Sequence, residues 1–176
     1  MNQVRLGIDI GATNTKAALV SVEQPHAVVW HETSPTPRDY QALRLHLEQL
    51  IPVARAQGNV NGIGLSVPAT IDPAGAIVAA GEAQWLIGQP LKRDVEAVVG
   101  HSVIIENDER CFAIAEYYLG EAKGVSPLAA IAIGTGMAAG LMIDGKLYRG
   151  AFGGAGELSH TIVRPAASDA ELETYT

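Results

Sequence analysis

The sequence predicts an α/β protein in which a mixed β-sheet is covered by helices. Three observations lead to this prediction. Three strand-like segments open the chain without a helix between them, as in an antiparallel meander, and helix-like segments separate later strands. Hydrophobic residues make up 48% and charged residues 18% of the 176 residues, which is too apolar for a disordered chain and sufficient for a buried core. Meander strands and helix-connected strands together favour a mixed sheet over a purely parallel one.

The individual elements follow from hydrophobic periodicity and from turn residues. Residues 4–10, 16–22 and 26–33 are rich in β-forming residues and predict the three meander strands. Residues 39–56 carry apolar side chains mostly at helical spacing, and Gly58 follows where that helix should end. The later strands are predicted at residues 61–67, 76–79, 102–105, 128–133, 138–143 and 146–148, and the later helices at residues 91–99 and 108–119.

Composition and charge exclude several classes of protein. The net charge is −7 and the basic residues are scattered, so we expect no nucleic-acid partner. Cys111 is the lone cysteine, which excludes an intramolecular disulfide and a metal site made of cysteines only. The apolar run near residue 8 is too short for a signal peptide, so we expect a cytoplasmic protein.

One uncharged stretch has the length of a membrane-spanning helix. Residues 124–143 contain no charged side chain. Pro127 and several glycines divide this stretch into two short β-like runs, and Asp144-Gly145 after it is typical of a hairpin turn. We therefore expect two strands here and no membrane partner.

One pattern occurs twice in the chain. Residues 7–13 (GIDIGAT) and residues 130–136 (AIAIGTG) both join an apolar strand to a turn of Gly and Thr, and Ile8 and Ile131 are 123 residues apart. Two related sub-domains with similar turns would explain the repetition. Two unrelated hairpins would explain it equally well.

The first segment that could carry chemistry is the run D-I-G-A-T-N-T-K at residues 9–16. Gly11 permits a tight turn in which backbone N–H groups and the hydroxyls of Thr13 and Thr15 could surround phosphate oxygens, and Asp9 could hold a hydrated Mg²⁺. A plain β-hairpin with an Asn-containing turn explains the same residues, and from this segment alone it is the simpler interpretation.

Two further segments can each be interpreted either as part of a functional site or as ordinary structure. Asn107 and Asp108 stand where a strand meets a helix, so Asp108 could be a general base for a hydroxyl or simply a helix cap. Glu157 and His160 follow the glycine-rich run at residues 153–156 and could bind the hydroxyls of a polyol. The alternative is a flexible loop with a solvated Glu157.

Taken in order, the motifs resemble those of the ROK family of bacterial sugar kinases and related repressors. They are D-I-G-A-T-N-T-K, G-L-S-V-P-A-T-I-D, E-N-D, I-G-T-G and G-G-A-G-E-L-S-H. The resemblance implies the actin-like, ribonuclease-H-like ATPase fold of the hexokinase and actin superfamily. It also implies a first domain at residues 1–122 and the beginning of a second at residues 123–176.

The resemblance implies roles for particular residues and two cofactors, ATP and Mg²⁺. Asp108 matches the catalytic base. The phosphate loops correspond to Asp9, Gly11, Thr13 and Lys16 and to Gly134, Thr135 and Gly136. The sugar ligands correspond to Asn107, Asp108, Glu157, His160 and Glu173. Mg²⁺ would lie near Asp9, held through water.

The chain departs from the family pattern in several places. The usual cysteine-rich zinc motif is replaced by residues 164–171 (RPAASDAE), so we expect no structural zinc. Glu82 stands where Asn is usual, and Ala69 stands where Gly is common. The segment that holds adenosine in family members has no counterpart in these residues. We expect the chain alone to bind a hexose weakly and to phosphorylate it poorly.

The function expected from this resemblance is ATP-dependent phosphorylation of a hexose or N-acetylhexosamine, by a protein that is a homodimer at full length. The alternatives are a non-catalytic sugar-binding fragment, a pseudokinase, and a ROK-type transcriptional regulator lacking its DNA-binding region. Sugar-dependent consumption of ATP would distinguish the kinase from all three.

Overall fold

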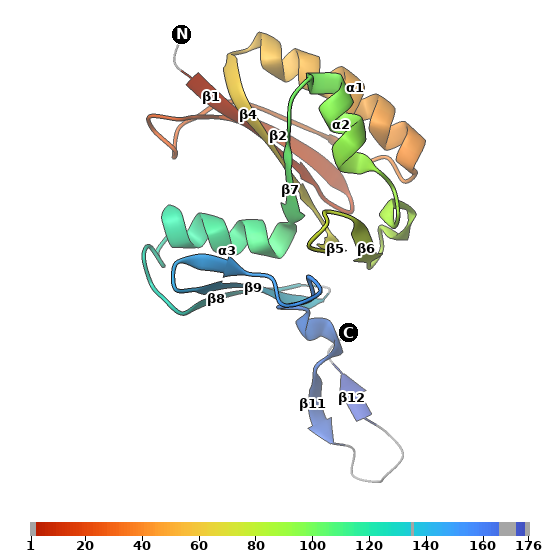
Figure 1. The fold of residues 1–176 in the computed structure, drawn as a ribbon, viewed down its shortest axis with the longest axis vertical. Helices are drawn as coiled ribbons and strands as arrows, with labels where there is room; N and C mark the ends of the chain where they lie inside the picture. Colours follow the sequence, from red (N-terminus) through yellow and green to blue (C-terminus); the bar gives the residue numbers. More distant parts are fainter. Residues whose placement is uncertain (1–2, 135, 166–171, 175–176) are drawn as a thin grey trace. The chain divides into compact units, whose positions relative to one another are not determined.

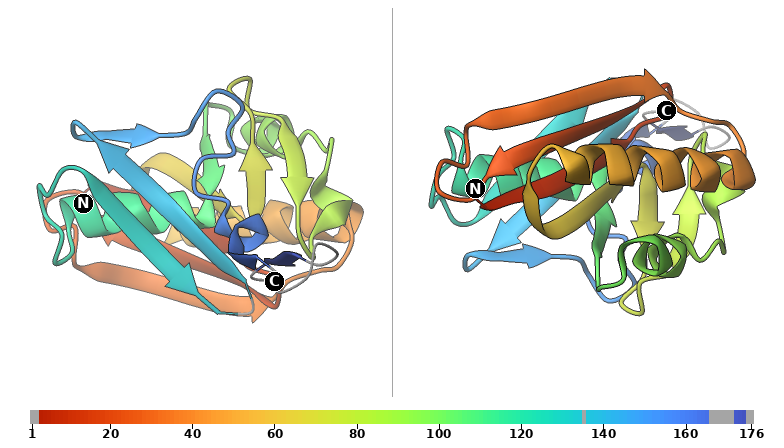
Figure 2. Two further views of the ribbon diagram at one scale, coloured as in Figure 1. Left: turned by 90° about the horizontal axis from the view of Figure 1, so that it is seen from below. Right: turned by 90° about the horizontal axis from the view of Figure 1, so that it is seen from above.

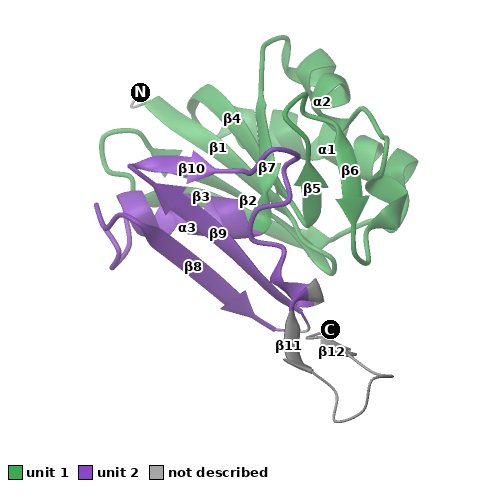
Figure 3. Ribbon diagram, turned by 60° about the horizontal axis from the view of Figure 1, so that its bottom comes forward, with its two compact units in different colours: residues 1–108 green, residues 109–176 purple. Residues whose placement is uncertain are grey.

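The computed structural model describes residues 3–134, 136–165 and 172–174. Two compact units make up the chain, residues 1–108 and residues 109–176, coloured separately in Figure 3. The α/β class expected from the sequence is confirmed by the alternation of strands and helices. The domain boundary expected between residues 122 and 123 stays a prediction.

The first unit is built on a five-stranded sheet (Figure 1). Its strands are β1 (Gln3–Ile10), β2 (Asn14–Ser21), β3 (Val28–Pro35), β4 (Asn59–Val67) and β7 (Ile104–Asn107), in the spatial order β3-β2-β1-β4-β7. The first three strands pair antiparallel, whereas β1, β4 and β7 run parallel to one another. Both the meander and the mixed sheet are therefore confirmed.

Helix α1 (Tyr40–Ala56) lies along one face of this sheet (Figure 2). The Asp39 carboxylate caps it, because its Oδ1 accepts a hydrogen bond from the N–H of Ala42 at 2.9 Å. Leu45, which departs from the helical spacing, is 51% exposed. The core between helices and sheet includes Leu6, Ile8, Leu43, Leu47, Leu65 and Leu91.

Helix α2 and a short hairpin complete the first unit. Helix α2 (Leu91–Val99) has the bounds that its sequence predicts, and it ends at Gly100, whose φ of 79° is left-handed. Strands β5 (Ala69–Ile71) and β6 (Ile77–Ala80) pair antiparallel and precede the 3₁₀ helix η1 (Gln84–Leu86). The sequence does not predict β5, because three residues show too little alternation.

Tyr40 joins the two helices of the first unit. Its hydroxyl donates a hydrogen bond of 2.7 Å to Oδ2 of Asp94 in α2. Burial of the phenol, followed by this hydrogen bond, raises the pKa of Tyr40 above its ordinary value. The folded state therefore holds the Tyr40 proton more tightly than the unfolded state does.

Replacing Tyr40 with Phe is expected to lower the free energy of unfolding by about 1.5–3 kcal/mol near pH 8, the value of a hydrogen bond to a charged acceptor. The raised pKa contributes stability that is fully present below the unfolded-state pKa of about 10 and is lost as the pH rises above it. The difference between the two proteins should therefore shrink above pH ~10. Urea titrations across this pH range measure it, and Tyr148→Phe at a half-exposed tyrosine is the control.

Strand β7 differs from its prediction. The sequence predicts a buried strand at residues 102–105, but the structure places it at Ile104–Asn107. Ile104 is 72% exposed, whereas Asn107 is 5% exposed. The reason is the pairing with β4, which sets Ile104 opposite Gly64 and continues until Asn107 lies opposite Val67. Among the residues that the structure describes, strand β7 is also the last strand at this edge of the sheet, with no further strand beside it.

The second unit contains most of helix α3 (Asp108–Tyr118) and a three-stranded antiparallel sheet. The strands are β8 (Leu128–Ile133), β9 (Met137–Ile143) and β10 (Lys146–Tyr148), in the order β10-β9-β8. Asp144 and Gly145 form the expected hairpin turn, with φ values of 50° and 72°. After the 3₁₀ helix η2 (Leu158–His160), strands β11 (Ile162–Pro165) and β12 (Leu172–Thr174) pair with each other.

A close contact between β9 and α3 organises the second unit. A Cβ added to Gly140 would overlap Ala113 and the carbonyl oxygen of Glu109, so only glycine permits this approach. The uncharged run at residues 124–143 forms β8 and β9, as expected. Within the part of the chain that the structure describes, none of the helices has the length and apolar character needed to cross a membrane.

Candidate active site

Three parallel strands of the first unit bring two of the predicted site residues, Asp9 and Asn107, to one edge of the sheet. Asp9 is the last residue but one of β1, and Asn107 ends β7. Between them lies β4, whose Ser66 is opposite both Asp9 and Glu106. In α/β sheets, ligands bind outside the carboxyl ends of the strands. This edge is therefore the candidate site of the first unit.

The Asp9 side chain points away from the core. Its neighbours Ile8 and Ile10 are each 1% exposed on the opposite face. The hydroxyl of Ser66 donates a hydrogen bond of 2.9 Å to Oδ1 of Asp9, which fixes the orientation of the carboxylate. Lys16 lies opposite Asp9 in the β1–β2 ladder. The arrangement presents an oriented carboxylate and a cation beside the turn that follows β1.

The turn after β1 is closed by a hydrogen bond from the Gly11 N–H to the Asn14 carbonyl at 3.1 Å. Thr13 is exposed in this turn. Thr15 contradicts our interpretation, because its hydroxyl does not face the same spot as that of Thr13. Thr15 is 1% exposed and shares a hydrogen bond of 2.9 Å with the hydroxyl of Thr36, since strand alternation turns it toward the core.

Asn107 and Asp108 lie side by side at the end of β7. The Asn107 Nδ2 donates a hydrogen bond of 3.1 Å to Oδ1 of Asp108. Asn107 is 5% exposed, and the Oε1 of Glu106 accepts from its backbone N–H at 3.0 Å. Asp108 is the first residue of α3. A buried amide therefore orients the carboxylate that the sequence proposes as a general base.

The glycine-rich segment at residues 153–157 is held against other parts of the second unit. The Arg110 guanidinium, which is 1% exposed, donates to the Gly153 carbonyl. The Gly156 carbonyl accepts from the Ala139 N–H at 2.8 Å. Glu157 follows and is exposed. These contacts contradict the interpretation of the segment as an unattached flexible loop.

Some predicted site residues lie outside what the structure describes. Thr135 is one of them, as are the side chains of His160 and Glu173, whose backbones belong to η2 and β12. Gly134 and Gly136 are described, and the Gly134 N–H donates to the Gly136 carbonyl at 2.9 Å. The ligand roles of all these residues stay predictions.

Sequence reasoning did not single out three residues that support the site: Ser66, Arg110 and Ser159. The G-L-S-V-P-A-T-I-D motif contains Ser66 and could have identified it as a site residue. Ser159 could likewise have been identified from its place between Glu157 and His160. Nothing in the sequence around Arg110 indicates its role, because its contact with Gly153 joins residues that are far apart in the chain.

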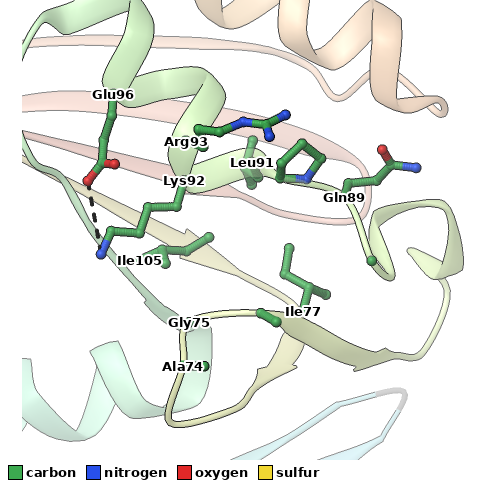
Figure 4. A pocket seen from close by; sticks show the side chains of 12 residues that line it. Ala74, Gly75, Ile77, Gln89, Leu91, Lys92, Arg93, Glu96 and Ile105 are labelled. Carbon is green, nitrogen blue, oxygen red and sulfur yellow. Dashed lines mark ion pairs between the residues drawn. The ribbon is translucent and has the colours of Figure 1, made fainter.

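A groove of about 350 Å³ in the first unit lies apart from these residues (Figure 4). The turn between β5 and β6 and the first turn of α2 form it, over an apolar floor of Ile77 and Ile105. Lys92 at its rim lies 4.0 Å from the Glu96 carboxylate, shown as a dashed line in Figure 4. The sequence-predicted site residues are not among those that line it, so we assign it no role in the site.

We predict that the purified protein holds no stoichiometric zinc. Among the residues that the structure describes, no three His, Cys, Asp or Glu side chains are grouped to hold a metal ion. His160 alone cannot close a tetrahedral site. Elemental analysis after dialysis without chelator is expected to give well below one zinc per chain. One zinc per chain would contradict the prediction.

Comparison with known proteins agrees with the motifs. The ROK family profile matches residues 5–171. The chain is 33% identical over 155 residues to the N-acetylgalactosamine kinase AgaK of Shewanella sp. (strain ANA-3), covering 88% of this chain and 50% of that protein. The chain thus spans about half the length of the curated relatives it matches.

Solved structures show the same fold. A ROK family glucokinase from Streptomyces griseus, in complex with glucose and AMPPNP, matches with a TM-score of 0.82 and 31% identity over 92% of this chain and 51% of that one. A ROK family transcriptional regulator matches with a TM-score of 0.81, 94% of this chain and 43% of that one, but at 23% identity, so this likeness shows the fold alone. The fold is that of the actin-like ATPases. With its family profile matched over residues 5–171, the chain belongs to the ROK family.

Proposed function

We propose that this protein is a sugar kinase that transfers the γ-phosphoryl group of ATP to a hydroxyl of a hexose or an N-acetylhexosamine. The observation that carries the proposal is the hydrogen-bonded pair of Asn107 and Asp108 at the carboxyl edge that also holds Asp9. The relatives support it, because they include an N-acetylgalactosamine kinase and a glucokinase bound to glucose and AMPPNP.

Asp108 would act as the general base of the transfer. Its carboxylate accepts the proton of the attacking sugar hydroxyl, the hydroxyl oxygen forms a bond to the γ-phosphorus, and the bond from that phosphorus to the ADP oxygen breaks. The amide of Asn107 keeps the Asp108 carboxylate in one orientation. Asn107, Glu157, His160 and Glu173 are the proposed ligands of the sugar hydroxyls.

The proposed phosphate ligands belong to two turns. The first comprises Gly11 and Thr13 with Lys16, and the second comprises residues 134–136. The residues present also fit Mg²⁺, since Asp9 offers a hard carboxylate ligand whose orientation Ser66 fixes. When bound, Mg²⁺ would offset the charge of the phosphates. The cytoplasmic location and the homodimer stay predictions.

Sugar-dependent release of ADP tests the proposal. A coupled assay with Mg²⁺ and ATP is run on a full-length version of the protein with glucose, fructose, N-acetylglucosamine, N-acetylgalactosamine and N-acetylmannosamine, and without sugar. ADP release that one of these sugars stimulates supports the proposal and identifies the sugar. Sugar binding by calorimetry without ADP release would instead support the sugar-binding fragment or pseudokinase. Neither binding nor turnover with any of the sugars would overturn the proposal.

A further inference from the structure

We propose that Ser159 is a positioning residue that ties the segment at residues 153–160 to the turn at residues 134–136. The inference rests on the proposed function, in which this segment carries the sugar ligands Glu157 and His160 and the turn binds phosphate. All of these residues belong to the second unit. Ser159 thereby fixes the spacing between the two halves of that unit's site.

The Ser159 hydroxyl binds both backbone groups of a single residue. Its Oγ accepts a hydrogen bond from the Met137 N–H at 3.2 Å and donates one to the Met137 carbonyl at 2.9 Å. Met137 is the first residue of β9 and directly follows the turn. A hydroxyl can donate and accept at once, which neither Ala nor Gly can do with a side chain.

The two contacts continue the pairing of β9 beyond the end of β10. Strand β10 pairs with β9 only from Leu141 to Ile143. Further along the same edge, the Ala139 N–H donates to the Gly156 carbonyl at 2.8 Å. Two residues before Ala139 on the same strand, Met137 forms its hydrogen bonds with Ser159. Backbone groups of alternate strand residues point to the same side, so Gly156 and Ser159 complete one edge of β9.

The turn and Ser159 are also close in space. A Cβ added to Gly136 would lie 3.1 Å from the Ser159 Oγ, which is tighter than an ordinary contact. A shift of Ser159 would therefore be transmitted to the turn through Met137 and Gly136. Phosphoryl transfer depends on alignment of donor and acceptor, and a misplacement of about 1 Å can cost ~10²-fold in rate.

Ser159→Ala and Ser159→Thr test the proposal, with Thr161→Ala as the matched loss of a nearby exposed hydroxyl. The first measurement is amide hydrogen exchange of the unliganded protein. Ser159→Ala should speed exchange at residues 136–137 by about tenfold or more, since the Met137 N–H loses its acceptor and this edge of β9 opens locally. Ser159→Thr should restore slow exchange, and Thr161→Ala should not alter it. Unchanged exchange in Ser159→Ala would overturn the proposal.

The second measurement separates positioning from a general structural role. In the sugar kinase assay, Ser159→Ala is expected to lower kcat by ~10–10²-fold with little change in the KM for sugar, and Ser159→Thr to recover most of kcat. A rise in KM at constant kcat would overturn the positioning role. A wild-type protein without sugar-dependent turnover would refute the proposed function. The hydrogen-exchange comparison would still show whether Ser159 holds the turn in place.

Discussion

Replacing Asp108 with Asn in a full-length version of the protein is expected to slow sugar phosphorylation by ~10²–10⁴-fold, the usual contribution of a general base. The amide has the same shape as the carboxylate, and its oxygen can still accept the hydrogen bond that Asn107 donates. It cannot take a proton from the sugar hydroxyl at neutral pH. Sugar binding, measured by calorimetry, should therefore survive, while the kcat measured by ADP release falls.

Asp108→Asn also separates the two roles that the sequence leaves open for this residue. Asn caps helices about as well as Asp does, so a residue that only starts α3 would tolerate the substitution. A near-normal kcat in Asp108→Asn would therefore assign Asp108 to helix capping and remove it from the mechanism. A loss of turnover with intact folding would support the base.

Asp144→Asn is the matched control for this substitution. Asp144 is exposed in the turn between β9 and β10 and has a φ of 50°. Asn tolerates this left-handed conformation well. The control changes the same charge in a hairpin turn, so it should keep both kcat and the free energy of unfolding. A fall in kcat of the control would show that net charge, and not the base, governs the rate.

Local patterns predicted much of the fold because local physics determines it. The apolar positions of α1 and the Asp144-Gly145 turn depend on neighbours within one helical turn or one hairpin, and both are confirmed. The displacement of β7 by two residues arises from its pairing with β4, which continues as far as Asn107 opposite Val67. The pairing register of two strands that are distant in the chain cannot be predicted from the sequence of either strand alone.

The candidate site was predictable to a similar degree. Asp9 and Asn107 end parallel strands, so their arrival at one edge follows once the strands are recognised. Thr15 shows the limit, because its position next to Thr13 in the sequence suggests one cluster, whereas strand alternation sends its hydroxyl to Thr36. Ser66 and Arg110 act on partners that are distant in sequence, and only the folded chain reveals those partners.

The repeated pattern corresponds to two hairpins in the structure. Strands β1 and β2 are antiparallel, with Ile10 opposite Thr15, and strands β8 and β9 are antiparallel, with Ile133 opposite Met137. The turn of the second hairpin is one residue shorter, which brings Gly136 directly before β9. The proposal that both turns bind phosphate comes from the family motifs, and the similarity of the two hairpins is compatible with it.

Replacing Gly156 with Ala is expected to destabilise the second unit by about 2–5 kcal/mol. The φ of Gly156 is +93°, a conformation that costs an L-residue roughly 1–2 kcal/mol. The added Cβ would also overlap the carbonyl oxygen of Ala139, and forcing extra atoms into a packed site costs about 1–3 kcal/mol. Rotation of a side chain cannot relieve an overlap between a Cβ and backbone.

Gly154→Ala is the matched control, two residues away in the same glycine-rich segment. A Cβ at Gly154 would meet no atom within 4 Å, and the φ of Gly154 lies outside the left-handed region. The effect of Gly154→Ala on stability should therefore stay within about 0.5 kcal/mol.

Both tryptophans, Trp30 and Trp85, belong to the first unit, so fluorescence alone would follow the wrong part of the chain. Hydrogen exchange of β8 and β9, compared with that of α1, measures the second unit by itself. We expect Gly156→Ala to speed exchange in β8 and β9 and to spare α1. Equal protection in both variants would show that the segment does not approach Ala139, and it would remove one of the anchors that hold Glu157 in the proposed site.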